Sequence, residues 1–432
     1  MRLRRAREGG IMRQTFKITD DEIFEYHLGG KVGLEMLKKL TDQRDLSMAY
    51  TPGVSKICEA IVEEDDLLYS LTSKGNTVAV VTDGTAVLGM GNIGPKASIP
   101  VMEGKAVLFK AFADIDGWPV PLEGVLGGDG RTDVEKFIET TKKLAVMYGG
   151  INIEDVAAPA CFEIEDRLDR ELDIPVFHDD QWGTAIITLA ALKNYCVVTG
   201  KKAEDISVVI NGAGAAGLRI ADMIKADGVK RCLICDSKGV VSKDRDDLNE
   251  HKKRHAVETS KGCLAEALKG ADVFIGVSVA GCLKEEMILS MAPFPAVFAM
   301  ANPVPEIMPE AVESCMKGKD FIMATGRSDF PNQINNVLGF PFIFRGALDV
   351  RAKRVTMGMK IAASEALASL AREGDIPEKV REAYGRDFEF GPDYLIPTPF
   401  DPRIRQWEAR AVAEAAIKEG VAKVDKVPDY SA

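Results

Sequence analysis

The stretch that most constrains the fold is a predicted strand at residues 206–210 that runs directly into Asn211-Gly-Ala-Gly-Ala-Ala-Gly217 and a helical pattern to residue 224. A second predicted strand, residues 231–235, ends in Asp236. This order of strand, three glycines, helix, strand and acid is that of a dinucleotide-binding unit, because glycines let backbone N–H groups reach a pyrophosphate at a helix N-terminus. The expected cofactor-binding residues are Gly212, Ala213, Gly214, Ala215, Ala216, Gly217 and Asp236.

The pattern after this unit predicts more strands, at residues 272–277, 296–300 and 321–324, as a doubly wound sheet requires. A chain of 432 residues is too long for one core, so we expect an α/β protein of two domains. Their expected extents are 16–180 for an N-terminal α/β catalytic domain and 181–432 for a C-terminal Rossmann-type NAD(P)-binding domain with C-terminal helices. Residues 1–15 are expected to be a disordered tail, and Met12 is a second possible start.

Acidic residues follow two predicted strands of the first half. Residues 149–153 run into Glu154 and Asp155, and residues 174–178 run into Asp179 and Asp180. If the two strands are neighbours, their carboxylates lie in one crevice. Several ligands that are all oxygens suit a hard divalent cation, Mg²⁺ or Mn²⁺. The alternative is that these acids are helix caps or solvated turn residues.

Other features of the first half are weaker signals. Residues 20–40 carry a helical apolar pattern, and Tyr50 stands just before the turn at residues 51–53. The glycine pattern at residues 89–94 is not expected to bind a nucleotide, because Pro95 follows at once and a helix is expected to begin near Pro100. Lys105, within that helix, is either a surface residue or part of a site.

Cys232, Cys235, His251 and His255 reproduce a zinc-finger spacing. The two cysteines lie on one predicted strand at an offset of three, which points them to opposite faces. We therefore expect no zinc site here.

The charge and cysteine content exclude several classes of protein. A formal charge of −11 argues against nucleic acid or an anionic membrane as a partner, and no apolar run approaches a membrane span. Eight cysteines scattered through a long chain with no evident secretion signal favour the reduced cytoplasm.

Five motifs in order give the chain a resemblance to malic enzymes of the short prokaryotic type, over roughly residues 40 to 402. They are Tyr50-Thr-Pro-Gly-Val54, Gly104-Lys105, Ile153-Glu-Asp155, Phe177-His-Asp-Asp-Gln-Trp-Gly-Thr184 and the glycine loop 212–217. The resemblance implies metal ligation by Glu154, Asp155 and Asp180, and a homodimer. It implies Lys105 as general base, Tyr50 as general acid, and Asn302 and Asn336 as substrate-binding amides.

The chain departs from the family pattern in three places. Position 182 is Trp where short-type members often carry His, and Ala86 stands where larger members place an arginine, so the group that neutralises the substrate carboxylate is not identified. The chain also stops without the phosphotransacetylase-like extension of some bacterial members.

The expected reaction is oxidative decarboxylation of L-malate to pyruvate and CO₂ with NAD(P)⁺ and Mg²⁺ or Mn²⁺. We expect a nearby divalent cation and burial to lower the pKa of Lys105 so that it acts as a base. Asp236 favours NAD, whereas Ser237 and Lys238 could receive a 2′-phosphate, so the cofactor stays open. The alternatives are a malolactic enzyme, a metal-independent amino-acid dehydrogenase, and a nucleotide-sensing module without catalysis.

Overall fold

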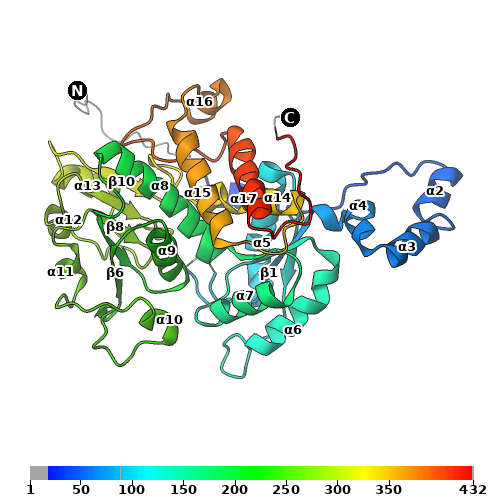
Figure 1. The fold of residues 1–432 in the computed structure, drawn as a ribbon, viewed down its shortest axis with the longest axis horizontal. Coiled ribbons are helices and arrows are strands. Elements are labelled where there is room, and N and C mark those ends of the chain that lie inside the picture. Colours follow the sequence, from blue (N-terminus) through cyan, green and yellow to red (C-terminus); the bar gives the residue numbers. More distant parts are fainter. Residues whose placement is uncertain (1–17, 88, 431–432) are drawn as a thin grey trace.

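Two parallel sheets lie side by side in the computed structural model, which describes residues 18–87 and 89–430 (Figure 1). The first sheet has the order β2-β1-β3-β4. Its strands are β1 (Thr77–Thr82), β2 (Asp116–Pro121), β3 (Gly150–Ile153) and β4 (Val176–His178). β1 and β3 are completely buried, as continuous apolar runs in a parallel sheet require.

Helices from both halves of the chain cover the first sheet. They are α5 (Gly94–Ala113), α6 (Val134–Leu144), α7 (Ala160–Glu171) and α14 (Phe340–Asp349). The Phe344 ring of α14 lies 5.4 Å from that of Phe109 on α5 and 5.9 Å from that of Phe177 on β4. A helix from late in the sequence thus completes the core of the first sheet, while the division of the chain at residue 180 remains a prediction.

The second sheet confirms the predicted doubly wound fold, with the order β10-β9-β8-β5-β6-β7. All its neighbouring strands are parallel except the short β7, which pairs antiparallel with β6. Its strands are β5 (Ser207–Asn211), β6 (Arg231–Asp236), β7 (Gly239–Val240), β8 (Val273–Gly276), β9 (Ala296–Ala299) and β10 (Ile322–Thr325). The glycine loop joins β5 to α9 (Ala215–Ala226), as the sequence predicted.

The other helices of this half pack around the second sheet or follow it. They are α8 (Thr184–Thr199), α10 (Glu250–Lys253), α11 (Leu264–Leu268), α12 (Glu285–Leu289), α13 (Pro309–Cys315), α15 (Met357–Arg372), α16 (Glu378–Tyr384) and α17 (Arg410–Lys418). Irregular chain follows α16, and the π-helical turn η6 (Arg405–Ala409) leads from it into α17. The buried Asn332 side chain ties this segment to the second sheet, because its amide donates to the carbonyls of Met323 and Pro392 and accepts from the Leu395 N–H.

The N-terminal segment begins beside α5, where Lys31 donates hydrogen bonds to Glu103 and to the Pro100 carbonyl, and its later helices stand away from both sheets (Figure 1). It contains α1 (Asp20–His27), α2 (Gln43–Ala49) and α3 (Val54–Glu63), followed by the single turn α4 (Leu68–Leu71). The helix predicted over residues 20–40 is wrong beyond His27, because Gly29 and Gly30 adopt φ of 86° and 81°, values that end a helix. The predicted tail at residues 1–15, with Met1 and Met12, lies outside the described residues.

Two further sequence observations can be placed in the fold. Cys232 and Cys235 lie on β6 but belong to the hydrophobic clusters on opposite sides of the sheet, as the strand alternation predicted. His251 instead stacks on Phe162, and His255 contacts Asp222. Within residues 18–87 and 89–430, no helix is both long and apolar enough to cross a membrane.

Candidate active site

The two acidic strand ends lie next to each other, because β3 and β4 are neighbouring parallel strands. Their register pairs Ile153 with His178, so Glu154 and Asp179 leave the sheet at the same edge. Both are buried, with exposed fractions of 4% and 0%. The predicted meeting of the two acidic strand ends is therefore observed at the C-terminal edge of a parallel sheet, while their role stays a prediction.

Lys105 of α5 reaches into this crevice and is buried. Its Nζ lies 2.8 Å from Glu154 Oε1 and 2.6 Å from Asp179 Oδ2, and 4.2 Å from the centre of the Phe340 ring. Burial disfavours the ammonium form, but Asp179 and Glu154 outweigh it, so the pKa of Lys105 is raised. The expectation of a lowered pKa included a bound divalent cation and stays a prediction. The sequence did not reveal the two carboxylates that face this amine and raise its pKa.

Polar neighbours orient each carboxylate of the crevice. Asn152 Nδ2 donates to Glu154 Oε2 at 2.8 Å, and the Asp155 N–H donates to Asp180 Oδ2 at 2.9 Å. The Asn336 amide donates to Asp179 Oδ2, the oxygen that also faces Lys105. This contact joins the second half of the chain to the acidic edge of the first sheet.

The charge balance of the crevice favours an additional cation. Burial raises the pKa of Glu154, of Asp179 and of Asp180, and Lys105 is the cation that pairs with this group. Asp179 Oδ1 has no hydrogen-bond partner within the described residues. Carboxylate oxygens in excess over cations fit a hard divalent ion such as Mg²⁺ or Mn²⁺.

The acidic side chains at the ends of β3 and β4 do not form a set of metal ligands in this structure. Within the described part of the chain, no three His, Cys, Asp or Glu side chains form a group that could hold a metal ion. The hydrogen bonds explain this arrangement, because Glu154 and Asp179 turn to Lys105 while Asp180 turns to the backbone of Asp155. The predicted ligand set of Glu154, Asp155 and Asp180 stays a prediction.

A π-helical turn, η4 (Asp179–Gly183), carries both aspartates from β4 into α8. Gly183 is required here by space, since an added Cβ would stand 1.9 Å from Asp179 Oδ1. Trp182, the departure from the family pattern, is buried, with Lys360 Nζ 3.5 Å and Arg219 Cζ 4.6 Å from its ring centre. These two cation–π contacts therefore hold Trp182, and with it the turn η4, in place.

The glycine loop of the second sheet has the close contacts that a pyrophosphate site needs. A Cβ on Gly212 would lie 2.5 Å from the Val277 carbonyl oxygen, and one on Gly217 would lie 1.8 Å from the Gly212 oxygen. A Cβ on Gly214 would meet nothing, so this residue borders open space at the start of α9. The arrangement fits a dinucleotide whose phosphates approach the backbone at Gly214.

Asp236 stands at the end of β6, as predicted, but its carboxylate is already bound. Arg245 and Lys252 both contact it, while Ser237 and Lys238 lie exposed in the turn that follows. The sequence missed Arg245 and Lys252, because both come after β7 and nothing in their spacing links them to Asp236.

Asn302 and the first glycine loop approach each other between the two halves of the chain. Asn302 follows β9, and a Cβ on Gly89 would lie 3.3 Å from its carbonyl oxygen. The reason given for excluding residues 89–94 as a nucleotide loop is wrong, because α5 begins at Gly94 with Pro95 in its first turn and Pro100 inside the helix. The loop nevertheless belongs to the first sheet, away from the glycines of β5 and α9.

Tyr50 is not brought to this crevice within the chain. It follows α2 in the part of the N-terminal segment that stands away from the sheets, and 69% of its surface is exposed (Figure 1). The predicted acid and the predicted base are therefore separated in one copy of the protein.

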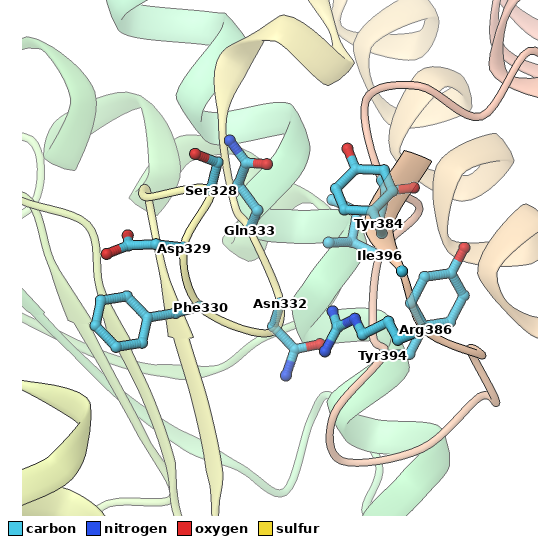
Figure 2. Close-up of a pocket in the computed structure, with 11 residues that line it drawn as sticks. Ser328, Asp329, Phe330, Asn332, Gln333, Tyr384, Arg386, Tyr394 and Ile396 are labelled. Atoms are coloured by element: carbon cyan, nitrogen blue, oxygen red, sulfur yellow. The ribbon is translucent and has the colours of Figure 1, made fainter. Parts of the chain in front are cut away.

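A separate cavity of about 220 Å³ lies between the loop after β10 and residues 384–398, where Gln333 and Arg386 contribute to its two walls (Figure 2). None of the predicted site residues lines it. It is not part of the lysine and carboxylate crevice.

Comparison with known proteins finds two family domains in the chain. Residues 30–127 match the model "Malic enzyme, N-terminal domain", and residues 182–381 match "Malic enzyme, NAD binding domain", which includes the glycine loop 212–217. The crystal structure of a malic enzyme from Pyrococcus horikoshii superposes with a TM-score of 0.85 and 42% identity, covering 94% of this chain and 92% of that one.

Curated relatives agree over nearly the whole chain. The NADP-dependent malic enzyme of Rhizobium meliloti is 50% identical over 94% of this chain, which spans only 53% of that relative's length. The bifunctional malic/malolactic enzyme of Bacillus subtilis is 50% identical over 93% of both chains. An NAD-dependent malic enzyme of Geobacillus stearothermophilus is 48% identical over 94% of this chain and 81% of its own length. On this evidence the chain belongs to the malic enzyme family.

Proposed function

We propose that this protein catalyses the oxidative decarboxylation of L-malate to pyruvate and CO₂ with reduction of NAD(P)⁺, in the presence of Mg²⁺ or Mn²⁺. The observation that carries the proposal is the buried Lys105 between Glu154 and Asp179, joined by Asn336 to the half of the chain that holds the glycine loop. Relatives named as NADP- and NAD-dependent malic enzymes support it.

Glu154, Asp155 and Asp180 are the proposed ligands of the divalent cation. Glu154 and Asp155 are buried and Asp180 is half-buried beside Asp179, so the group carries more carboxylates than Lys105 balances, and Asp180 Oδ2 accepts the Asp155 N–H. When bound, the nicotinamide accepts the hydride from C2 of malate, and the divalent cation acts as a Lewis acid that lets the C3–C4 bond release CO₂.

Lys105 is the proposed general base for the C2 hydroxyl. It is the buried amine of the crevice, and a base must lie within hydrogen-bond reach of the proton that it removes. Its two carboxylate partners hold it protonated, so it loses its proton only when their charge is balanced by another cation. Asn302 and Asn336 are the proposed donors to the substrate carboxylates, because amides donate hydrogen bonds without adding charge.

Tyr50 is the proposed acid that protonates C3 of enolpyruvate, and it acts in a homodimer. α1 and α3 contain no buried residue, and apolar side chains of the N-terminal segment are widely exposed, for example Leu28 at 87% and Leu34 at 90%. Exposed apolar surface of this extent marks a protein interface. We therefore place the N-terminal segment of one copy against the other copy, where its Tyr50 completes the site.

The cytoplasm is the proposed location. All eight cysteines are free thiols, and Cys161, Cys232 and Cys235 are buried without forming disulfides. Such unpaired thiols are typical of a reducing compartment.

A malolactic reaction is the second candidate, because a relative that is matched over 93% of its own length is named as a bifunctional malic/malolactic enzyme. That reaction retains the nucleotide and yields lactate. The two candidates therefore differ in whether reduced nucleotide accumulates.

The test is a malate-dependent assay at 340 nm with NAD⁺ and NADP⁺ in parallel, with and without Mn²⁺, followed by analysis of pyruvate and lactate. We expect reduced nucleotide and pyruvate in equal amounts, and loss of both with a chelator. Lactate without reduced nucleotide would establish the malolactic reaction, whereas oxidation of an amino acid that a chelator does not affect would indicate a dehydrogenase of another kind.

A further inference from the structure

We propose that the cavity between the loop after β10 and residues 384–398 is a binding site for a small organic monocarboxylate, held by the Arg386 guanidinium and the Tyr394 hydroxyl (Figure 2). Figure 2 shows that these two side chains belong to one wall, while Gln333 comes from the loop that forms the other. The inference goes beyond the reaction proposed above and does not depend on it.

The Tyr394 hydroxyl is a buried donor that lacks a partner. Tyr394 lines the cavity and is 3% exposed, and its hydroxyl oxygen has no hydrogen-bond partner within the described residues. Its ring packs against that of Phe388, with the two centres 5.0 Å apart. Burial raises the pKa of Tyr394, so the hydroxyl keeps its proton. Because an unpaired buried polar group is unfavourable, an acceptor oxygen in the cavity stabilises this arrangement.

Arg386 supplies a positive charge that the surrounding acids do not fully balance. Two other arginines next to the cavity, Arg327 and Arg403, each contact an aspartate at 2.7 Å, and these aspartates raise their pKa. Burial instead lowers the pKa of Arg386, and the attraction of Asp393 does not offset it. An anion in the cavity therefore stabilises this half-buried guanidinium.

The size and lining of the cavity favour a small monocarboxylate. Its volume of about 220 Å³ lies below the range of about 300–1,000 Å³ that is typical of pockets for drug-sized ligands. Phe330 and Ile396, which are 5% and 1% exposed, provide an apolar surface for a short aliphatic body. Asp329 also lines the cavity but is paired with Arg327, so Arg386 is left to balance one negative charge and not two. A planar carboxylate also matches the fork of a guanidinium group.

The two walls are joined before any ligand binds. The buried Asn332 amide, in the loop after β10, donates to the Pro392 carbonyl at 2.7 Å and accepts from the Leu395 N–H at 2.7 Å. Both partners flank Tyr394 in the opposite wall. A cavity that is formed in advance requires little ordering of the protein when a ligand enters.

The test is a titration of the whole protein with acetate, butyrate and butyramide, followed by saturation transfer to the methyl protons of each compound. Butyramide has the shape of butyrate without its charge. We expect butyrate to bind about 10- to 100-fold more tightly than butyramide, because it alone forms charge-assisted hydrogen bonds. Butyrate should bind about 10-fold more tightly than acetate, because it buries two more CH₂ groups.

Two variants and a control locate the carboxylate. Tyr394→Phe removes only the unpaired hydroxyl, so it should keep at least the wild-type thermal stability and bind butyrate about 2- to 10-fold more weakly. Arg386→Gln should weaken butyrate binding by about 10- to 100-fold and leave the butyramide affinity unchanged. Arg381→Gln is the matched control, since Arg381 is an exposed arginine of α16 paired with Glu378, and it should alter neither affinity.

Three results would overturn the proposal. Full-strength butyrate binding in both Tyr394→Phe and Arg386→Gln would place the carboxylate elsewhere in the molecule, and equal wild-type affinities for butyrate and butyramide would show that charge is not recognised. Absence of saturable binding of both carboxylates would remove the site. Inorganic phosphate serves as a further probe, and phosphate binding that is tighter than butyrate binding and lost in Arg386→Gln would replace the carboxylate with a phosphate.

Discussion

Asp180 is the carboxylate whose replacement best tests the proposed metal site. Asp180→Asn removes one charge but keeps an oxygen that can accept the Asp155 N–H, so the turn should retain its shape. We expect the Mn²⁺ dissociation constant to rise by at least about 100-fold, because even groups that only support a metal site typically contribute about 10- to 100-fold. Electron paramagnetic resonance of free Mn²⁺ during a titration measures this.

Two comparisons make the Asp180 result specific. NAD(P)H binding to Asp180→Asn should stay at the wild-type level, because the glycine loop lies in the second sheet. Glu135→Gln, which changes a surface carboxylate paired with Arg167, should leave the Mn²⁺ affinity unchanged. Wild-type Mn²⁺ affinity in Asp180→Asn would remove this residue from the ligand set.

The sequence predicted where the acidic residues gather but not what each one contacts. Asp179 and Asp180 are adjacent, and only the π-helical turn determines that Asp179 faces Lys105 while Asp180 faces the Asp155 backbone. Asn152, which orients Glu154, sits inside a strand that reads as ordinary apolar core. Contacts made across several elements carry no local sequence signal, so the raised pKa of Lys105 could not be predicted.

The helix that follows the glycine loop supports a second test. Gly214→Val should fold normally, because a Cβ at this position would meet no heavy atom within 4 Å other than those of its own neighbours in the chain. It should weaken NAD(P)H binding by about 10- to 100-fold, because the branched side chain keeps the phosphates from the backbone N–H groups. Fluorescence titration with NADH and NADPH measures the loss.

Substitutions at two other glycines distinguish an effect on nucleotide binding from an effect on folding. Gly217→Ala places a Cβ 1.8 Å from the Gly212 carbonyl oxygen, so this variant should lose thermal stability as well as binding. Gly91→Ala, in the loop beside the first sheet, should reduce turnover with little change in nucleotide affinity. Equal loss of NAD(P)H binding in Gly214→Val and Gly91→Ala would mean that both loops hold the nucleotide.

Most strands followed from the apolar pattern, and there are physical reasons for two elements that did not. β2 contains Pro119 and Pro121, which argue against a strand, but it lies at the edge of its sheet, where a missing N–H is tolerated. α5 begins six residues before the predicted start, because Pro95, and not Pro100, occupies its first turn. The five main strands of the second sheet were found because their runs are long, apolar and separated by clear turn signals.

The arrangement of the whole molecule was the least predictable from sequence. The apolar pattern over residues 20–40 predicted a helix packed on its own chain, yet Leu34 and Leu37 are 90% and 74% exposed. The spacing of apolar residues shows that one face of a segment must be buried, but it does not show whether the same copy or another copy of the chain buries it. The family resemblance implied Lys105 as the base and Tyr50 as the acid of one site, and the structure separates them within a copy.

Mixing two inactive variants decides whether Tyr50 acts across the dimer. Tyr50→Phe and Lys105→Ala should each abolish malate oxidation as homodimers. If each site combines Lys105 of one copy with Tyr50 of the other, a mixed dimer contains one site in which both residues are intact. Random pairing of two chains in equal amounts should then restore about one quarter of the wild-type activity, since about half of the dimers are mixed and each has one complete site.

The opposite arrangement gives a different result. If Tyr50 folds back onto the Lys105 of its own copy, every site in a mixed dimer lacks one of the two residues, and co-expression restores nothing. Different tags on the two chains allow the mixed dimer to be purified. The control is a second mixed dimer, purified in the same way, in which one chain carries both Tyr50→Phe and Lys105→Ala and the other chain is wild type. That control keeps one complete site in the back-folded arrangement and none in the exchanged one, so the two purified dimers should show opposite activities.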